Sequence, residues 1–162
     1  MLSEEFLSID ETTLPEGQIL AQALADLGIC RSFYIDIPRP EDLFASSWLS
    51  DDVTGNNARY CLVAKTSGAI VGAVRFEGLL ISYFVLPEFQ GKGYGTRMVA
   101  KGCSWIFTAS STDIILATVL RENLRSRSIL ERLGFRFIGL EFSQQNKTAI
   151  LKYQLRQFEF NQ

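Results

Sequence analysis

Three glycines, each separated by one residue, lie within residues 90–95 and are the part of this 162-residue chain best suited to chemistry. They follow an apolar run from Ile81 to Pro87, which has the β-branched and aromatic residues typical of a buried strand. A helical pattern over Thr96 to Phe107 comes next. Glycines leave the backbone exposed, and the first N–H groups of a helix have no partner inside it. The segment therefore predicts an anion site, most simply a phosphate cradle, at the end of a strand.

Two common phosphate loops do not fit this segment. A P-loop requires Lys-Ser or Lys-Thr after its last glycine, and here Gly95 is followed by Thr96 and Arg97. The dinucleotide fingerprint requires a wider glycine spacing and an acidic residue further along. The pattern that is present is Gln90-x-x-Gly93-x-Gly95 after a strand. Taken alone, it is also compatible with a glycine-rich turn that binds nothing.

A second motif follows about thirty residues later. Residues 114–119 are a β-branched run that predicts a buried strand. Asn123 is suited to cap the helix that follows, and Gly134 is suited to end it. Within this stretch the chain contains Asn-x-x-Ser over 123–126 and Leu-Glu-Arg-Leu-Gly-Phe over 130–135.

In this order and spacing, the two motifs resemble the core of the GCN5-related N-acetyltransferases (GNAT) over about residues 79–139. The second motif is closest to the ribosomal-protein N-terminal acetyltransferase branch. The resemblance implies an α/β protein with the acyl-CoA N-acyltransferase fold, in which helices flank a central, mixed, mostly antiparallel sheet. It also implies that the strands over 79–86 and 114–119 are parallel and splay apart, with the pantetheine arm of acetyl-CoA between them.

The resemblance also assigns roles to residues. Amides of the loop would bind the CoA pyrophosphate, backbone N–H groups near Phe84 and Val85 would polarise the thioester carbonyl, and Asn123 would bind the pantetheine. The implied cofactor-binding residues are Phe84, Val85, Gln90, Gly91, Lys92, Gly93, Tyr94, Gly95, Thr96 and Asn123. Lys92 could equally be a solvated lysine, and Asn123 could be a helix cap and a ligand at once. Ser126 would lie near the sulfur as a catalytic residue, or it could satisfy its own helix.

The chain departs from the family at two catalytic positions. The tyrosine that usually protonates the leaving group is replaced by Leu130, and the positions of the frequent strand glutamate are Leu80 and Ile81. Glu77 is the nearest carboxylate and becomes the candidate general base, although a surface role is an alternative. The other candidates are Glu122 and Glu141.

Composition narrows the chemistry further. The chain has no histidine, which excludes histidine-based triads, bases and metal sites. Its three cysteines form no Cys-x-x-Cys pair, so we expect no metal and a reducing compartment. A net charge of −2 gives no nucleic-acid or membrane signature. No long apolar run is visible, so we expect a cytoplasmic protein, either a monomer or a homodimer.

We expect one domain over 1–162, with an acceptor-binding half at 1–70 and an acetyl-CoA-binding core at 79–139. Aromatic residues at 33–34 and 44–48 could line the acceptor groove or belong to the core, and Tyr83 is equally ambiguous. The predicted helices cover 15–27, 41–49, 96–107 and 123–133. The predicted strands cover 6–9, 31–37, 60–65, 69–76, 79–85, 114–119, 135–142 and 148–158.

The expected function is transfer of an acetyl group from acetyl-CoA to a primary amine of a small molecule or protein. A catalytically degenerate CoA-binding regulatory module is the alternative, because the tyrosine and the strand glutamate are both missing. The third possibility is an unrelated α/β interaction domain whose glycine turn binds no ligand.

Overall fold

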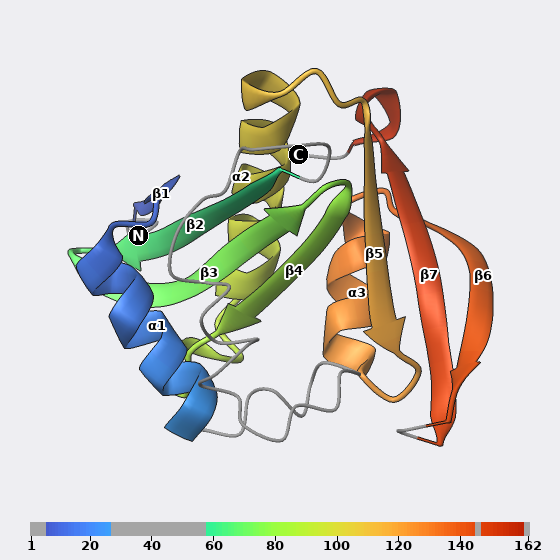
Figure 1. Cartoon of the computed structure of the whole chain (residues 1–162), viewed down its shortest axis with the longest axis horizontal. Coiled ribbons are helices and arrows are strands. Elements are labelled where there is room, and N and C mark those ends of the chain that lie inside the picture. The colour runs from blue at the N-terminus through green and yellow to red at the C-terminus, as the bar shows by residue number, and fades with distance from the viewer. Residues whose placement is uncertain (1–5, 27–57, 145–146, 161–162) are drawn as a thin grey trace, which may run out of the picture.

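The computed structural model describes residues 6–26, 58–144 and 147–160 (Figure 1). Seven strands form one sheet in the order β1-β2-β3-β4-β5-β7-β6. The strands are β1 (Leu7–Glu11), β2 (Arg59–Thr66), β3 (Ala69–Glu77), β4 (Leu80–Val85), β5 (Ile114–Leu120), β6 (Arg136–Ser143) and β7 (Thr148–Arg156). The helices are α1 (Leu14–Asp26), α2 (Tyr94–Ala109) and α3 (Leu124–Arg132). Every neighbouring pair is antiparallel except β4 and β5, which are parallel. The expected mixed, mostly antiparallel sheet is confirmed.

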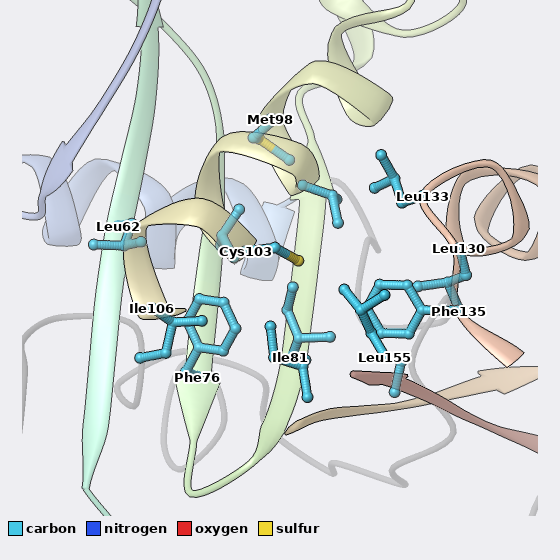
Figure 2. Packing of buried hydrophobic residues seen from close by; sticks show 14 of the residues in the cluster. Leu62, Phe76, Ile81, Met98, Cys103, Ile106, Leu130, Leu133, Phe135 and Leu155 are labelled. Carbon is cyan, nitrogen blue, oxygen red and sulfur yellow. The ribbon is translucent and has the colours of Figure 1, made fainter. Parts of the chain in front are cut away.

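The side chains of each strand alternate between two cores. On β4, Ile81 and Tyr83 face the larger core, which α2 and α3 cover, whereas Phe84 faces the smaller one. In Figure 2, Met98, Cys103 and Ile106 of α2 point toward the sheet. The remaining labelled side chains of that core are Leu62, Phe76, Ile81, Leu130, Leu133, Phe135 and Leu155.

Helix α1 closes the smaller core through Leu20, which is completely buried. Its start is a reciprocal cap: the Glu16 carboxylate accepts from the Thr13 N–H at 3.1 Å, and the Thr13 hydroxyl oxygen accepts from the Glu16 N–H at 3.4 Å. Lys65 of β2 adds an ion pair with Glu16 at 2.7 Å. These contacts fix α1 on the face opposite to α2 and α3.

The feature that matters most for function is the short contact between β4 and β5. Only Leu80 with Leu116 and Ile81 with Ala117 are paired, and beyond them the strands diverge toward their carboxyl ends (Figure 1). Helix α3 lies over this opening. The splay that the resemblance implied is therefore present. It leaves the last residues of β4 without a neighbouring strand on that side.

Most predicted elements are present, with ends shifted by a few residues. The helix after the glycines begins at Tyr94, two residues before its predicted start, because Gly93 rather than Gly95 forms its N-cap. The final strand ends at Arg156 and a short 3₁₀ turn follows it. The strand predicted at 31–37, the helix at 41–49 and the aromatic residues at 33–34 and 44–48 lie outside the described residues.

Candidate functional site

The opening between β4 and α3 is a cleft of about 680 Å³. One wall is the end of β4, the glycine loop and the start of α2, and the other is the start of α3. The lining residues are Tyr83, Phe84, Val85, Phe89, Gln90, Gly91, Gly93, Gly95, Thr96, Glu122, Asn123, Leu124, Arg125, Ser126, Ser128, Ile129 and Arg132. The cleft thus contains residues of both sequence motifs, which the fold brings together.

Two glycines give the loop its shape. After β4, a 3₁₀ turn over Pro87–Phe89 reverses the chain, and Gly91 and Gly93 then adopt φ values of 75° and 84°. Residues with a Cβ rarely adopt this left-handed region. Gly93 is the N-cap of α2, and no side chain caps that helix end. The amides of its first turn, at the positive end of the helix dipole, are therefore suited to an anion in the cleft.

Gly95 is required for a different reason, which is the close approach of two helices. A Cβ at this position would lie 2.9 Å from Cδ1 of Ile129 in α3 and 3.6 Å from Cγ2 of Val85. These distances leave no room for a larger side chain unless Ile129 moves. Gly95 therefore allows the start of α2 to lie close to the Ile129 side chain of α3.

Gln90 connects the two walls. Its Nε2 donates to the carbonyl oxygen of Val85 at 2.9 Å, and its Oε1 accepts from Nη1 of Arg125 at 3.1 Å. The first bond holds the loop against the end of β4, and the second crosses to α3. Arg125 and Arg132 also bring two positive charges to the lining of the cleft.

The start of α3 places a hydroxyl in the cleft. Oδ1 of Asn123 accepts from the Ser126 N–H at 3.2 Å, so the helix cap predicted for Asn123 is confirmed. Ser126 is in the first turn, where its hydroxyl forms a short hydrogen bond with the hydroxyl of Tyr83 on β4. Burial raises the pKa of the Tyr83 phenol more strongly than its hydrogen bond with Ser126 lowers it. Both hydroxyls line the cleft.

Other predicted site residues lie elsewhere. Lys92 is exposed on the loop, and the Tyr94 side chain is buried against Phe89 with ring centroids 5.5 Å apart. Glu77 is at the end of β3, opposite Leu80, where it forms an ion pair with the buried Arg75. None of these three residues is among the cleft-lining residues.

The two alternative carboxylates are in different places. Glu141 is on the outer strand β6 and forms an ion pair with Lys152 at 3.0 Å. Glu122 lines the cleft, and a hydrogen bond from the Thr148 hydroxyl lowers the pKa of its carboxyl group. Glu122 is therefore the one of the three candidate bases that reaches the cleft among the described residues.

Sequence reasoning did not assign Arg125, Ile129 and Arg132 to the site. They share a face of α3 at helical spacing, a pattern that is visible in the sequence once Ser126 is placed in the cleft. Leu130, at the position of the family tyrosine, is fully buried in the larger core.

Within the described residues, no group of acidic, cysteine or histidine side chains could hold a metal ion. In the same part of the chain, none of the helices has the length and apolar character needed to cross a membrane.

Many solved structures have a similar fold, and three of them illustrate the likeness. Spermidine N-acetyltransferase from Vibrio cholerae, in complex with CoA and spermine, is 16% identical with a TM-score of 0.79, over 94% of this chain and 96% of that one. Aminoglycoside acetyltransferase AAC(6')-Ib, in complex with coenzyme A and kanamycin, is 15% identical at 0.74, over 95% and 96%. Mycobacterium smegmatis RimJ, in complex with CoA-disulfide, is 20% identical at 0.73, over 96% and 84%.

The sequence comparisons identify the family. No curated protein is similar enough to this chain to count as a match. The family model of the acetyltransferase (GNAT) domain, however, matches residues 22–136, well over half of the chain. The match includes both walls of the cleft. The chain therefore belongs to the GNAT acetyltransferases, enzymes that transfer an acetyl group from acetyl-CoA to an amine.

Proposed function

We propose that this enzyme binds acetyl-CoA in the cleft between β4 and α3 and transfers the acetyl group to a primary amine of a small molecule or protein. The observation that carries the proposal is the position of the loop at the mouth of the splay. An uncapped helix start with two left-handed glycines provides amides for a pyrophosphate, and an extended arm can lie along β4 where the pairing with β5 has ended.

The binding residues divide by chemistry. The amides of residues 91–96 would bind the pyrophosphate, and Arg125 and Arg132 would add charge-assisted contacts to phosphate oxygens. Gln90 would keep the loop against β4 through its bond to Val85. Lys92 remains a possible phosphate contact from the exposed side of the loop. Asn123 would combine its capping role with a contact to the pantetheine.

The chemistry would use backbone and side chains together. N–H groups near Phe84 and Val85 would polarise the thioester carbonyl, and Ser126 would donate to the sulfur. Glu77 is our candidate general base, because it is directly opposite Leu80, one of the positions where family members often have a glutamate. Residues directly opposite on antiparallel strands have Cβ atoms about 4.5–5.5 Å apart, so the two side chains occupy neighbouring places.

The acceptor is the remaining part of the proposal. The acceptor-binding half would be residues 1–70, of which only 6–26 and 58–70 are described. Spermine and kanamycin, bound in two of the similar structures, both have several amino groups, and RimJ is a third similar structure. We propose a small-molecule amine or a protein amine as acceptor. We also propose a cytoplasmic location and a monomeric or homodimeric state.

A combined binding and turnover measurement tests this function. Acetyl-CoA should raise the melting temperature of the wild-type protein, since a ligand that binds only the folded state adds RT ln(1 + [L]/Kd) of stability. Free thiol should then appear when polyamines, aminoglycosides and N-terminal peptides are supplied in turn. The absence of any shift at millimolar acetyl-CoA would overturn the proposed site.

The degenerate alternative has its own support. Leu80, Ile81 and Leu130 are apolar where family members often have catalytic groups, and Leu130 is fully buried. This alternative predicts a thermal shift with acetyl-CoA but no thiol release with any amine in the panel. Thiol release that falls in Ser126→Ala would exclude it.

A further inference from the structure

Two hydroxyl groups meet inside the cleft from opposite walls. Tyr83 is on β4 and Ser126 is in the first turn of α3, 43 residues later, and their hydroxyls form a short hydrogen bond. The Tyr83 hydroxyl is also 3.4 Å from the Ser126 carbonyl oxygen, at the weak end of the hydrogen-bond range. A contact between such distant segments exists only because α3 covers the splay.

The position of this pair is defined by the strands. β4 and β5 are last paired at Ile81 and Ala117, and Tyr83 is two residues further along β4 on the same face. The glycine loop follows the end of β4 at Val85 and the short 3₁₀ turn after it. If the loop binds the pyrophosphate, as the proposed function requires, an extended arm passes along Val85 and Phe84 and brings its reactive end to Tyr83.

Apart from the weak contact with the Ser126 carbonyl oxygen, the two hydroxyls of the pair leave one donor for a ligand. Each hydroxyl has one hydrogen, and their mutual bond uses one of the two. Oδ1 of Asn123 accepts a hydrogen bond from the backbone N–H of Ser126, which fixes the orientation of that residue. Because burial raises the pKa of the phenol, Tyr83 keeps its proton and the pair donates hydrogen bonds rather than protons.

The other described cleft hydroxyls are less well placed. Thr96 is at the start of α2, beside the proposed pyrophosphate, and Ser128 is exposed on α3. Leu130, the position of the family tyrosine, has no hydroxyl. At the inner end of the cleft, the described residues therefore offer Tyr83 and Ser126 for contact with a sulfur atom.

We propose that Tyr83 is a further catalytic residue, which together with Ser126 forms a two-hydroxyl donor to the sulfur of the departing CoA. In the transfer, the amine nitrogen bonds to the acetyl carbon and the C–S bond breaks, with its electron pair remaining on sulfur. The free hydroxyl hydrogen of the pair stabilises this thiolate, and the proton lost by the amine passes to solvent. No proton leaves the pair.

The direct test measures the thiol pKa of bound CoA, from the ultraviolet absorbance of the thiolate across pH, with desulfo-CoA as the blank. Loss of one hydrogen bond should raise this pKa by about one unit in Tyr83→Phe and in Ser126→Ala. The double variant should rise no further, because the two hydroxyls act as one donor. Turnover should fall about tenfold in kcat, with KM for acetyl-CoA within about twofold.

Tyr60→Phe is the matched control, since Tyr60 packs on Trp105 with ring centroids 5.3 Å apart and does not line the cleft. It should leave the thiol pKa unchanged. Thermal unfolding shows whether each variant is folded. If Tyr83→Phe does not fold, Ser126→Ala decides whether the hydroxyl pair donates to the sulfur. An unchanged thiol pKa in a folded variant that binds CoA normally would overturn the role of Tyr83 while the proposed function stands. Failure of the wild-type protein to bind CoA would overturn both.

Discussion

The two walls of the cleft offer a ligand different kinds of chemical group. The wall formed by the end of β4 and the start of α2 includes the exposed backbone shaped by Gly91, Gly93 and Gly95, together with side chains such as Tyr83. The wall formed by α3 presents side chains, among them Arg125 and Ser126. Backbone amides can hold a phosphate whatever the neighbouring residue types are, whereas side chains can be exchanged one at a time.

This difference separates binding of the acetyl donor from its reaction. The backbone wall depends on conformation, so a change there should affect binding of the donor as a whole. The side-chain wall depends on individual groups, so changes there should affect one contact each. Substitutions on each wall test this division.

Gly95→Leu should have the largest effect. A side chain here must displace Ile129, because the first added carbon already lies 2.9 Å from it. The loss of several charge-assisted contacts to the phosphates, each worth roughly 1.5–3 kcal/mol, corresponds to a Kd for acetyl-CoA raised by at least about 100-fold. Isothermal titration calorimetry measures this change.

Gly139→Leu is the control for Gly95→Leu. Gly139 is on the outer strand β6, and no atom lies within 4 Å of the place that its Cβ would occupy. It should bind acetyl-CoA as the wild-type protein does. Normal binding by a folded Gly95→Leu variant would show that the backbone wall does not hold the donor.

Arg125→Ala should have the next largest effect, which is confined to charge. We expect a rise of about tenfold in Kd for acetyl-CoA and a weaker dependence of Kd on salt, because one charged contact is lost. Arg136→Ala is the control, since this arginine pairs with Glu159 and is not among the cleft-lining residues. Equal Kd values for Arg125→Ala and the wild-type protein would show that Arg125 only holds the Gln90 side chain in place and does not contact the donor.

Asn123 can separate the capping role from the binding role. Asn123→Ala should destabilise the protein by about 1 kcal/mol, through loss of the cap on α3. Asn123→Ser keeps a capping oxygen but lacks the amide, so it should restore the melting temperature. Weaker acetyl-CoA binding that persists in Asn123→Ser would support a contact with the pantetheine, and full recovery would show that Asn123 is only a cap.

The sequence was sufficient to predict the features that depend on neighbouring residues alone. Left-handed φ values require glycine at 91 and 93, and the Asn123 cap depends on a residue three positions away, so both are visible in short segments. The parallel, splayed pair β4 and β5 came from the family resemblance, since no residue type encodes a gap between strands.

Contacts between distant segments could not be predicted. The bond from Arg125 to Gln90 spans 35 residues and that from Tyr83 to Ser126 spans 43, and both depend on how α3 is placed over the splay. Tyr83 alternates with Phe84 along β4, which shows that they face opposite sides but not which side is the cleft. The placement of α3 decides this.

Glu122→Gln should have the smallest effect and the opposite sign. This carboxylate brings a negative charge into the wall that holds the arginines, so its removal should lower the Kd for acetyl-CoA by about twofold to threefold at neutral pH. The hydrogen bond from Thr148 lowers the pKa of Glu122 below its usual value of 4.5. The carboxylate therefore stays charged at pH values above that. The difference between variant and wild type should therefore persist from neutral pH to about pH 5 and vanish as the pH falls further, when the carboxylate takes up a proton. A Kd for Glu122→Gln that is higher than that of the wild-type protein would indicate that this carboxylate contributes to donor binding, and the side-chain wall would then hold the donor through more than its cations.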